Sequence, residues 1–466
     1  MQSQMQEKTN SIKKMKKPIS TFFDNTKKVF KEGGSLDRAS VIGSYVFPGL
    51  GHVFSKQFIK GIIMMLVTIG YIVFMITWGA ASIKGFFTLQ RENILSQYNI
   101  VYGFVAFVVT AFMIVVWSIS IKGTLNNCLG KLAGKKLNSF VTDLKLLTTS
   151  KFYILLLIVP VVGALAFTVI PLLFMIAIAF TNFSTNTGAG GVIPWLNVKH
   201  LDWTGFASFK YLLSAGDNLK AFGGVMSWTL IWALFATITC FFGGLFLAML
   251  LNKKVVKGKI VWRTLFIIVM ATPQIVSLRI MYSMFHNNGP INGVLLNLGW
   301  ISTRIEFWDN QLIARILIIF INMWVGIPYF MLLMSGLLIN IPKDYYEYAS
   351  IEGASKFYMF KKITMPYILF LTTPVLITSF IQNINNFNVI YLLTGGGPSG
   401  DVVNSVAGKT DIMITWLYKL TMQRAGTAEY NLGAAIGIIM FILSITFSLL
   451  TYRKSKSYKN EGDFSL

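Results

Sequence analysis

Four polar side chains stand in one strongly apolar stretch of the chain, and their spacing places them together. They are Ser379, Gln382, Asn383 and Asn386, and offsets of three, four and seven residues put them on one face of a helix. Amides and hydroxyls supply neutral hydrogen-bond donors and acceptors, and Tyr329 in the preceding apolar stretch supplies a flat apolar surface. This combination suits a hydroxyl-rich sugar. Hydrogen bonding between helices is the alternative use of such side chains.

Residues for covalent, metal or nucleotide chemistry are sparse. Cys128 and Cys240 lie far apart without a Cys-x-x-Cys pattern, so neither a disulfide framework nor a metal site is predicted. His52 is predicted to be a plain interfacial side chain with no partner. Glycines and lysines in residues 123–137 loosely resemble a phosphate loop, but no Ser or Thr follows either Gly-Lys pair. We therefore expect neither catalysis nor a cofactor in this chain.

The composition requires a membrane to surround these residues. Of 466 residues, 54% are hydrophobic and only 13% are charged. Stretches long enough to cross a bilayer as helices predict an all-α polytopic bundle of about eight transmembrane helices. The expected spans are 61–79, 100–119, 152–180, 223–251, 264–285, 313–338, 367–390 and 432–452. None contains Asp or Glu, which argues against a secondary transporter driven by an ion gradient.

The net charge of +23 is distributed by side of the membrane. Thirty of the 41 Lys and Arg residues lie in the two termini and in alternate connecting segments, and nine lie in the other connections. By the positive-inside rule, both termini are cytoplasmic in a bacterial cell membrane. The charge is therefore a topology signal, and no nucleic-acid partner is expected. Arg315 is predicted to be an interfacial anchor; Arg279 either faces the bundle interior or reaches toward the outer surface.

A polar segment at 343–366, on the predicted cytoplasmic side, lies between two spans. Apolar residues recur at helical spacing until Pro366, after small residues and Gly353, so the pattern predicts a helix, a glycine turn and a second helix that Pro366 ends. Ala349 and Ala354 keep its surface low enough for another protein to approach. An amphipathic loop on the membrane surface is the alternative.

This segment resembles the EAA loop of the permeases of ATP-binding-cassette (ABC) importers. The matching residues are Glu347, Ala349, Glu352, Gly353, Ala354, Phe360, Ile363 and Pro366. Tyr348 departs from the usual Ala, and Glu352 from the usual Asp. The stretch 386–398, ending in Gly-Gly-Gly-Pro, is similar to the carbohydrate branch of the family and especially to maltose/maltodextrin permeases of the MalF type.

The resemblance implies a domain layout and a set of partners. The layout is a basic arm and interfacial segment at 1–60, two accessory helices at 61–150, a six-helix permease domain at 151–455 and a tail at 456–466. The implied partners are a second, MalG-like permease subunit, two ATPase subunits that hold ATP and Mg, an extracellular sugar-binding protein, an oligosaccharide and the bilayer. The arm is expected to be flexible, and the external segment 181–221 to lack the folded domain of some MalF-type proteins.

The resemblance also implies the sugar contacts. In MalF-like permeases the sugar is held by the helix after the EAA loop and by the kinked helix before it. The corresponding residues here are Val325, Gly326, Tyr329, Ser379, Asn383 and Asn386, with Gln382 replacing an aromatic residue. Gly326 and Pro328 are predicted to kink their span beside a cavity, although packing alone also explains them. The implied function is import of maltose or maltodextrins by alternating access. An importer of another sugar, an ion-coupled transporter, and a membrane sensor or assembly factor are the alternatives.

Overall fold

The computed structural model describes residues 17–89, 96–135, 137–184, 201–214, 216–253, 255–400, 406–422 and 428–454. Helices make up the regular structure of these residues, with only two isolated β-bridges, so the predicted all-α class is confirmed. Contacts divide the chain into two compact units, 1–177 with 200–202 and 178–199 with 203–466. The predicted tail at 456–466, and residues 185–200 and 215 of the expected external segment, lie outside the described residues. The predicted domain layout stays a prediction.

The first unit contains the helices up to α10, and they are given in order here: α2 Lys17–Glu32, α3 Ser35–Val46, α4 Leu50–Phe54, α5 Phe58–Phe74, η1 Met75–Gly79, α6 Ala80–Thr88, α7 Ser96–Leu132, α8 Phe140–Thr148, α9 Phe152–Ala164, η2 Leu165–Val169 and α10 Ile170–Ala179. The η segments are single π-helical turns inside longer helices. The continuous helices Phe58–Thr88, Tyr98–Leu132 and Phe152–Ala179 are long and apolar enough to cross a membrane.

The described part of the N-terminal arm, from residue 17 onward, is not the flexible segment that its composition predicts. Residues 17–32 form α2, whose Val29 is fully buried in a small cluster with Val41, Leu125 and Cys128. The expectation was wrong because Phe22 and Val29, seven residues apart, give the lysine-rich helix one apolar face that packs against α3 and α7. Deleting residues 1–35 would therefore remove Val29 and uncover the rest of this cluster.

His52 is also more enclosed than predicted. It lies in α4 with 4% of its surface exposed, and its Nδ1 is 3.0 Å from Gln57 Oε1. Asn127 Nδ2 donates to the same Gln57 oxygen at 2.8 Å, while His52 Nε2 is buried without a hydrogen-bond partner among the described residues. Burial lowers the pKa of the His52 imidazole. The segment expected to lie along the interface thus forms α3 and α4, which pack on α7.

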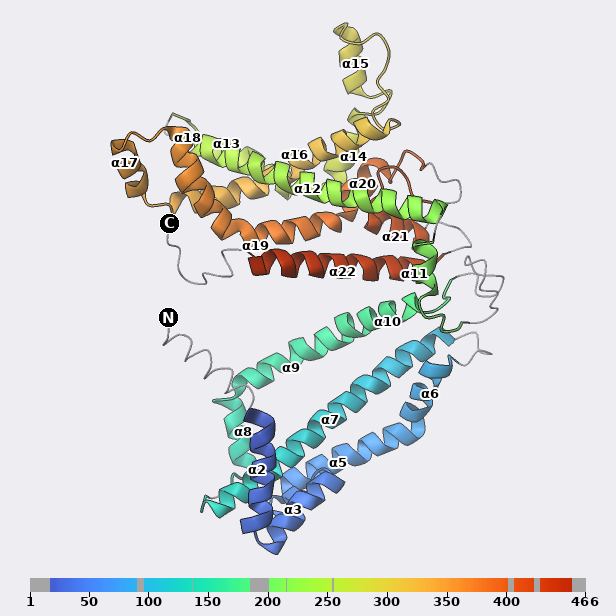
Figure 1. Ribbon diagram of the computed structural model, residues 1–466, viewed down its shortest axis with the longest axis vertical. Helices are drawn as coiled ribbons and strands as arrows, with labels where there is room; N and C mark the ends of the chain where they lie inside the picture. The colour runs from blue at the N-terminus through green and yellow to red at the C-terminus, as the bar shows by residue number, and fades with distance from the viewer. Residues whose placement is uncertain are drawn as a thin grey trace. The chain divides into compact units, whose positions relative to one another are not determined.

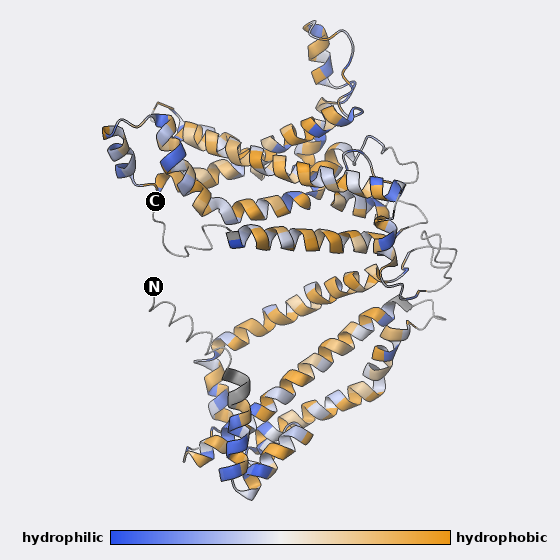
Figure 2. Ribbon diagram, in the orientation of Figure 1, coloured by the Kyte–Doolittle hydropathy of each residue, from blue (hydrophilic) through white to orange (hydrophobic). Residues whose placement is uncertain are grey.

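The second unit holds the remaining helices: α11 Ala207–Leu212, α12 Asp217–Asn252, α13 Lys259–Ala271, α14 Gln274–Met284, α15 Pro290–Asn297, α16 Gln311–Ile339, α17 Lys343–Ile351, α18 Lys356–Met359, η3 Phe360–Thr364, α19 Met365–Ile384, α20 Phe387–Thr394, α21 Met413–Met422 and α22 Tyr430–Lys454. Helix α12 packs against both α16 and α19, and α22 packs against α19 (Figure 1). Hydrophobic residues run along these four helices, and hydrophilic ones gather at α17 and α18 (Figure 2).

The membrane spans agree with the prediction except at one place. Seven helices in the described residues are long and apolar enough to cross a bilayer. The expected span at 264–285 is instead a pair, α13 and α14, bent by 94°. The break falls at Thr272 and Pro273, and proline lacks the backbone N–H that would continue the helix.

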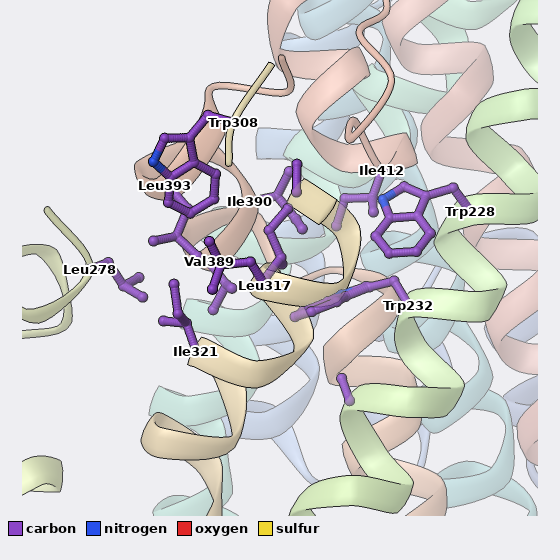
Figure 3. Close-up of a cluster of buried hydrophobic side chains, with 13 residues drawn as sticks. Trp228, Trp232, Leu278, Trp308, Leu317, Ile321, Val389, Ile390, Leu393 and Ile412 are labelled. Atoms are coloured by element: carbon purple, nitrogen blue, oxygen red, sulfur yellow. The ribbon is translucent and has the colours of Figure 1, made fainter. Parts of the chain in front are cut away.

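A buried apolar cluster joins one end of this helical bundle. The cluster contains Trp228 and Trp232 from α12, Leu317 and Ile321 from α16, and Ile390 from α20. The two tryptophans lie on one side of it, and Ile321 and Leu278 lie on the other (Figure 3). Trp232 is fully buried. Large aromatic side chains bury more apolar area than any others, so this cluster fixes α12, α16 and α20 as a rigid frame. Asn383 of α19 lies directly beside the cluster, since the Trp232 indole donates a hydrogen bond to its backbone carbonyl.

Candidate functional site

The seven residues implied for sugar binding come from three places in the second unit. Val325, Gly326 and Tyr329 lie on α16, Ser379, Gln382 and Asn383 lie on α19, and Asn386 precedes α20. Helix α12 contacts both α16 and α19 and thereby brings the two groups to one part of the bundle. Asn383, the central polar residue of the set, shows in detail how its position is fixed.

Asn383 is held from two directions by α12. Its Nδ2 donates to Thr237 Oγ1 at 3.0 Å, and its backbone carbonyl accepts from Trp232 Nε1 at 3.0 Å. Thr237 Oγ1 already donates its single proton to the carbonyl of Ala233 at 2.7 Å. The hydroxyl can therefore only accept from Asn383. This fixes the orientation of the amide and leaves Asn383 Oδ1 facing away from α12 as an acceptor.

Asn386 completes this chain of polar groups but is not on the same helix. Helix α19 ends at Ile384, and Asn386 is the N-cap of α20, accepting from the backbone N–H of Val389 at 3.3 Å. Its Nδ2 lies 3.4 Å from Asn383 Oδ1. The prediction of one continuous helical face is thus wrong for Asn386, because the chain turns at Asn385. A turn still brings the two amides together.

The side chains of Ser379, Gln382 and Tyr329 form no hydrogen bonds within the described part of the chain. Ser379 is half-buried and Gln382 is exposed. Tyr329 exposes 47% of its surface. Their polar atoms therefore remain available to a ligand, whereas the Asn383 and Asn386 amides are partly committed to bonds within the chain. Both the sugar-binding interpretation and the interhelical one have support, from different members of the set.

Gly326 has a packing role in the structure. A Cβ at this position would lie 2.5 Å from Cys240 Sγ, so only glycine allows α16 to approach α12 this closely. Cys240 Sγ also contacts the carbonyl of Asn322 at 3.7 Å. Helix α16 runs without a break through Pro328. The alternative reading of Gly326 as a packing residue is therefore the one that its contacts support.

The polar segment at 343–366 has the predicted helix, turn and helix. Helix α17 ends at Ile351, and Gly353 takes the left-handed conformation with φ of 76°. The Ala354 N–H donates to the Ala349 carbonyl at 2.9 Å across the turn, which closes the α17 terminus. We call residues 343–366 the coupling loop from here on.

The coupling loop is held by a hydrogen bond and by packing on the side that faces the helical bundle, and it is exposed on the opposite side. Tyr346 Oη lies 2.8 Å from Thr364 Oγ1, and Phe360 packs against the core. Three large apolar side chains are among the most exposed of the chain: Tyr348 at 70%, Ile351 at 80% and Phe357 at 73%. Glu347, Glu352 and Gly353 are also exposed. An apolar surface beside acidic residues suits contact with another protein.

Pro366 does not end the second helix as predicted. The helix continues from α18 through the π-turn η3 into α19, and Pro366 is near the start of α19. A π-turn bonds each N–H to the carbonyl five residues back, as Met365 does to Phe360. This shift supplies a place for a proline, which has no N–H to bond, inside a continuous helix.

A buried ion pair that the sequence did not reveal fastens the Gly-Gly-Gly-Pro loop. Lys419 Nζ donates to Asp411 Oδ2 at 2.6 Å, and the Thr415 hydroxyl donates to Oδ1 at 2.8 Å. Gly396, with φ of 86°, lies so close that a Cβ there would collide with both charged groups. Burial raises the pKa of the Asp411 carboxyl, and the Lys419 ammonium opposes that shift. The spacing of Asp411, Thr415 and Lys419 at helical intervals was the available signal.

Arg315 also holds the segment that follows the Gly-Gly-Gly-Pro sequence, and it is not the interfacial anchor that we predicted. Its Nε and Nη2 donate to the Lys409 carbonyl at 3.0 and 2.7 Å, and its guanidinium lies 4.4 Å from the centre of the Trp228 ring. Trp228 Nε1 donates to the neighbouring Thr410 carbonyl at 3.1 Å. The loop is thus attached to α12 and α16 together. Arg279, in contrast, is exposed on α14.

The helical bundle, the polar residues around Asn383 and the exposed coupling loop together define the class of the protein as a polytopic transport permease. The chain belongs to the family of binding-protein-dependent transport system inner membrane components, the permeases of ABC importers, whose pattern matches residues 240–456. This membership supports the ABC-importer interpretation over the ion-coupled alternative.

Relatives over nearly the full chain place it in the sugar branch. It is 33% identical over 423 residues to the galactooligosaccharides transport system permease protein GanP of Bacillus subtilis, covering 90% of this chain and 97% of that one. It is 31% identical to the maltodextrin transport system permease protein MalC of Streptococcus pneumoniae, covering 89% and 95%.

A solved structure supports the fold. The crystal structure of a bacterial ABC transporter involved in the import of the acidic polysaccharide alginate contains a chain that matches 68% of this one and 99% of its own length. The TM-score is 0.52 at 19% identity. At this identity the likeness concerns the fold alone.

Proposed function

We propose that this chain moves maltodextrin-type oligosaccharides across the bacterial cell membrane. The observation that carries the proposal is the polar set around Asn383, in a family whose full-length relatives include a maltodextrin permease. Neutral amides, the Ser379 hydroxyl and the Tyr329 ring match the hydroxyls and apolar faces of a neutral glucan.

Transport in this proposal follows from alternating access. An extracellular sugar-binding protein delivers the oligosaccharide to the outer end of the bundle, and a second, MalG-like permease subunit completes the path. An apolar groove of 390 Å³ on α12, α13, α14 and α16 is a suitable surface for that subunit. Trp324 and Phe320 line the groove and expose 51% and 63% of their surfaces. Both termini are cytoplasmic, in agreement with the distribution of Lys and Arg.

Two ATPase subunits drive the cycle, and they bind ATP and Mg. The coupling loop docks on one of them through Tyr348, Ile351 and Phe357, with Glu347 and Glu352 at the rim. The turn at Gly353 keeps α17 and α18 in a fixed relation, so closure of the ATPases moves α19 as a lever. No step of this cycle requires covalent chemistry on the present chain.

The coupling role is tested at Gly353. Its φ of 76° is strained for other residues, while a Cβ there would meet no neighbouring atom. Gly353→Pro or Gly353→Val should distort the turn and abolish sugar-stimulated ATP hydrolysis, and Gly353→Asn, which tolerates this conformation, should retain it. Normal stimulation in the Pro and Val variants, with membrane insertion unchanged, would reject docking through this turn.

Galactooligosaccharides are the second candidate substrate, because GanP is 33% identical and aligns over 97% of its length. Uptake of labelled maltotriose and of labelled β-galactotriose is measured separately in proteoliposomes containing the complete transporter, and we expect uptake of maltotriose and not of β-galactotriose. The reverse pattern would assign the chain to galactooligosaccharides. No uptake of either sugar would reject both.

A further inference from the structure

Helix α2 has a second exposed face that its packing against the first unit does not use. Phe22 and Val29 lie on one face of α2, which packs in the cluster with Val41 and Leu125. Phe23, next to Phe22, remains 60% exposed, and Phe30, next to Val29, remains 39% exposed. These two rings are seven residues apart and so lie on one face, two turns from each other.

Lysines share this face with the rings. Lys27 is four residues after Phe23 and Lys31 is one residue after Phe30, and both are exposed. The resulting stripe of Phe23, Lys27, Phe30 and Lys31 alternates aromatic rings with positive charges. Over residues 1–40 as a whole, nine Lys and Arg outnumber four Asp and Glu. An exposed apolar face of this charge requires a partner that is negative at its surface and apolar beneath.

The position of α2 in the first unit identifies that partner. Helix α2 packs near the C-terminal end of α7, the helix whose described part, Tyr98–Leu132, is long and apolar enough to span the membrane. It crosses the end of α7 and does not continue along it (Figure 1). A short basic helix held across the end of a membrane span lies at the level of the lipid headgroups.

We propose that α2 is an interfacial helix whose stripe binds anionic phospholipid of the cytoplasmic leaflet. The Phe23 and Phe30 rings enter the boundary between headgroups and acyl chains, and the Lys27 and Lys31 ammonium groups bind the phosphates. Zwitterionic lipid has no net surface charge to attract the lysines, so binding depends on anionic lipid. The contact anchors the first unit to the leaflet independently of the sugar path.

A labelled variant tests the proposal in the full-length chain. Phe23→Cys carries an environment-sensitive fluorophore, and the native Cys128 and Cys240 are buried. The chain is placed in nanodiscs of phosphatidylcholine alone or mixed with phosphatidylglycerol. We expect quenching of the label by aqueous iodide to fall by at least about threefold when phosphatidylglycerol is present. Adding Lys27→Gln and Lys31→Gln should remove the difference.

Glu32→Cys is the matched control, because Glu32 is exposed and lies nine residues after Phe23, which places it on the opposite side of α2. Its label should be quenched equally in both nanodiscs. Equal quenching of the Phe23 label in the two lipids would overturn the proposal, as would protection that appears only when ATPase subunits are added, which would make the partner a protein. Thermal unfolding of each variant in detergent confirms that α2 remains folded.

Discussion

Replacing Thr237 by valine should disturb sugar transport through Asn383, although Thr237 itself is buried. Valine keeps the shape of threonine and removes the oxygen that accepts from Asn383 Nδ2 at 3.0 Å. A hydrogen bond of this kind contributes about 1 kcal/mol, and the Asn383 amide is then free to rotate and to present its NH₂ group where its oxygen should be. An energy of about 1 kcal/mol corresponds to roughly a fivefold change in rate.

The assay is maltotriose uptake by the complete transporter in proteoliposomes, at saturating sugar and binding protein, beside basal ATP hydrolysis. Thr237→Val should lower uptake about fivefold and leave basal hydrolysis unchanged, and Thr237→Ser should transport normally. Thr239→Val is the control on the same helix, since Thr239 is half-buried, donates to the Phe235 carbonyl at 2.7 Å, and lies two residues after Thr237 on another face of α12. If Asn383→Ala impaired uptake while Thr237→Val did not, the argument that Thr237 orients the amide would be refuted.

Three further substitutions test the packing and the charges. Gly326→Ala should destabilise the second unit by about 1–3 kcal/mol in thermal unfolding, because its Cβ would lie 2.5 Å from Cys240 Sγ. Adding Cys240→Ala to the same chain should recover most of the lost stability. No recovery would contradict the contact. Lys419→Met should destabilise by about 3–5 kcal/mol, because it leaves Asp411 buried and unpaired, and Asp411→Asn should rescue much of that loss. Burial lowers the pKa of His52, so the folded state takes up a proton on the imidazole less readily than the unfolded state does. The stability should therefore fall as the pH drops below the ordinary pKa of 6.5. His52→Gln should flatten this dependence of stability on pH, measured by unfolding in detergent.

Residues that act through local pattern could be predicted from the sequence. Apolar runs of sufficient length gave seven of the eight expected spans, and the turn at Gly353 followed from glycine between two helical patterns. The spacing also placed Ser379, Gln382 and Asn383 together on one helix, whereas Asn386 comes close to Asn383 through a turn that the spacing did not predict. In each case a short stretch of chain contains the whole physical reason.

Residues whose roles depend on a distant partner could not be predicted in this way. Thr237 and Asn383 are 146 positions apart, and neither local sequence predicts the contact between them. Arg315 looked like a membrane anchor because its partner, the Lys409 carbonyl, belongs to the backbone of another segment. The apolar run at 264–285 gave no measure of the 94° bend, because a proline can either kink a helix or end it.

The outer side of the coupling loop has a consequence for how the cell must make this protein. Tyr348, Ile351 and Phe357 are exposed on the face that the proposed ATPase subunit covers. A chain that is inserted in excess of that subunit exposes this apolar patch to the cytoplasm. Chaperones bind such surfaces, and membrane proteases use them to select unassembled subunits for degradation. Steady abundance of the permease should therefore follow the supply of its ATPase, and depletion of the ATPase should shorten the permease's lifetime in the membrane.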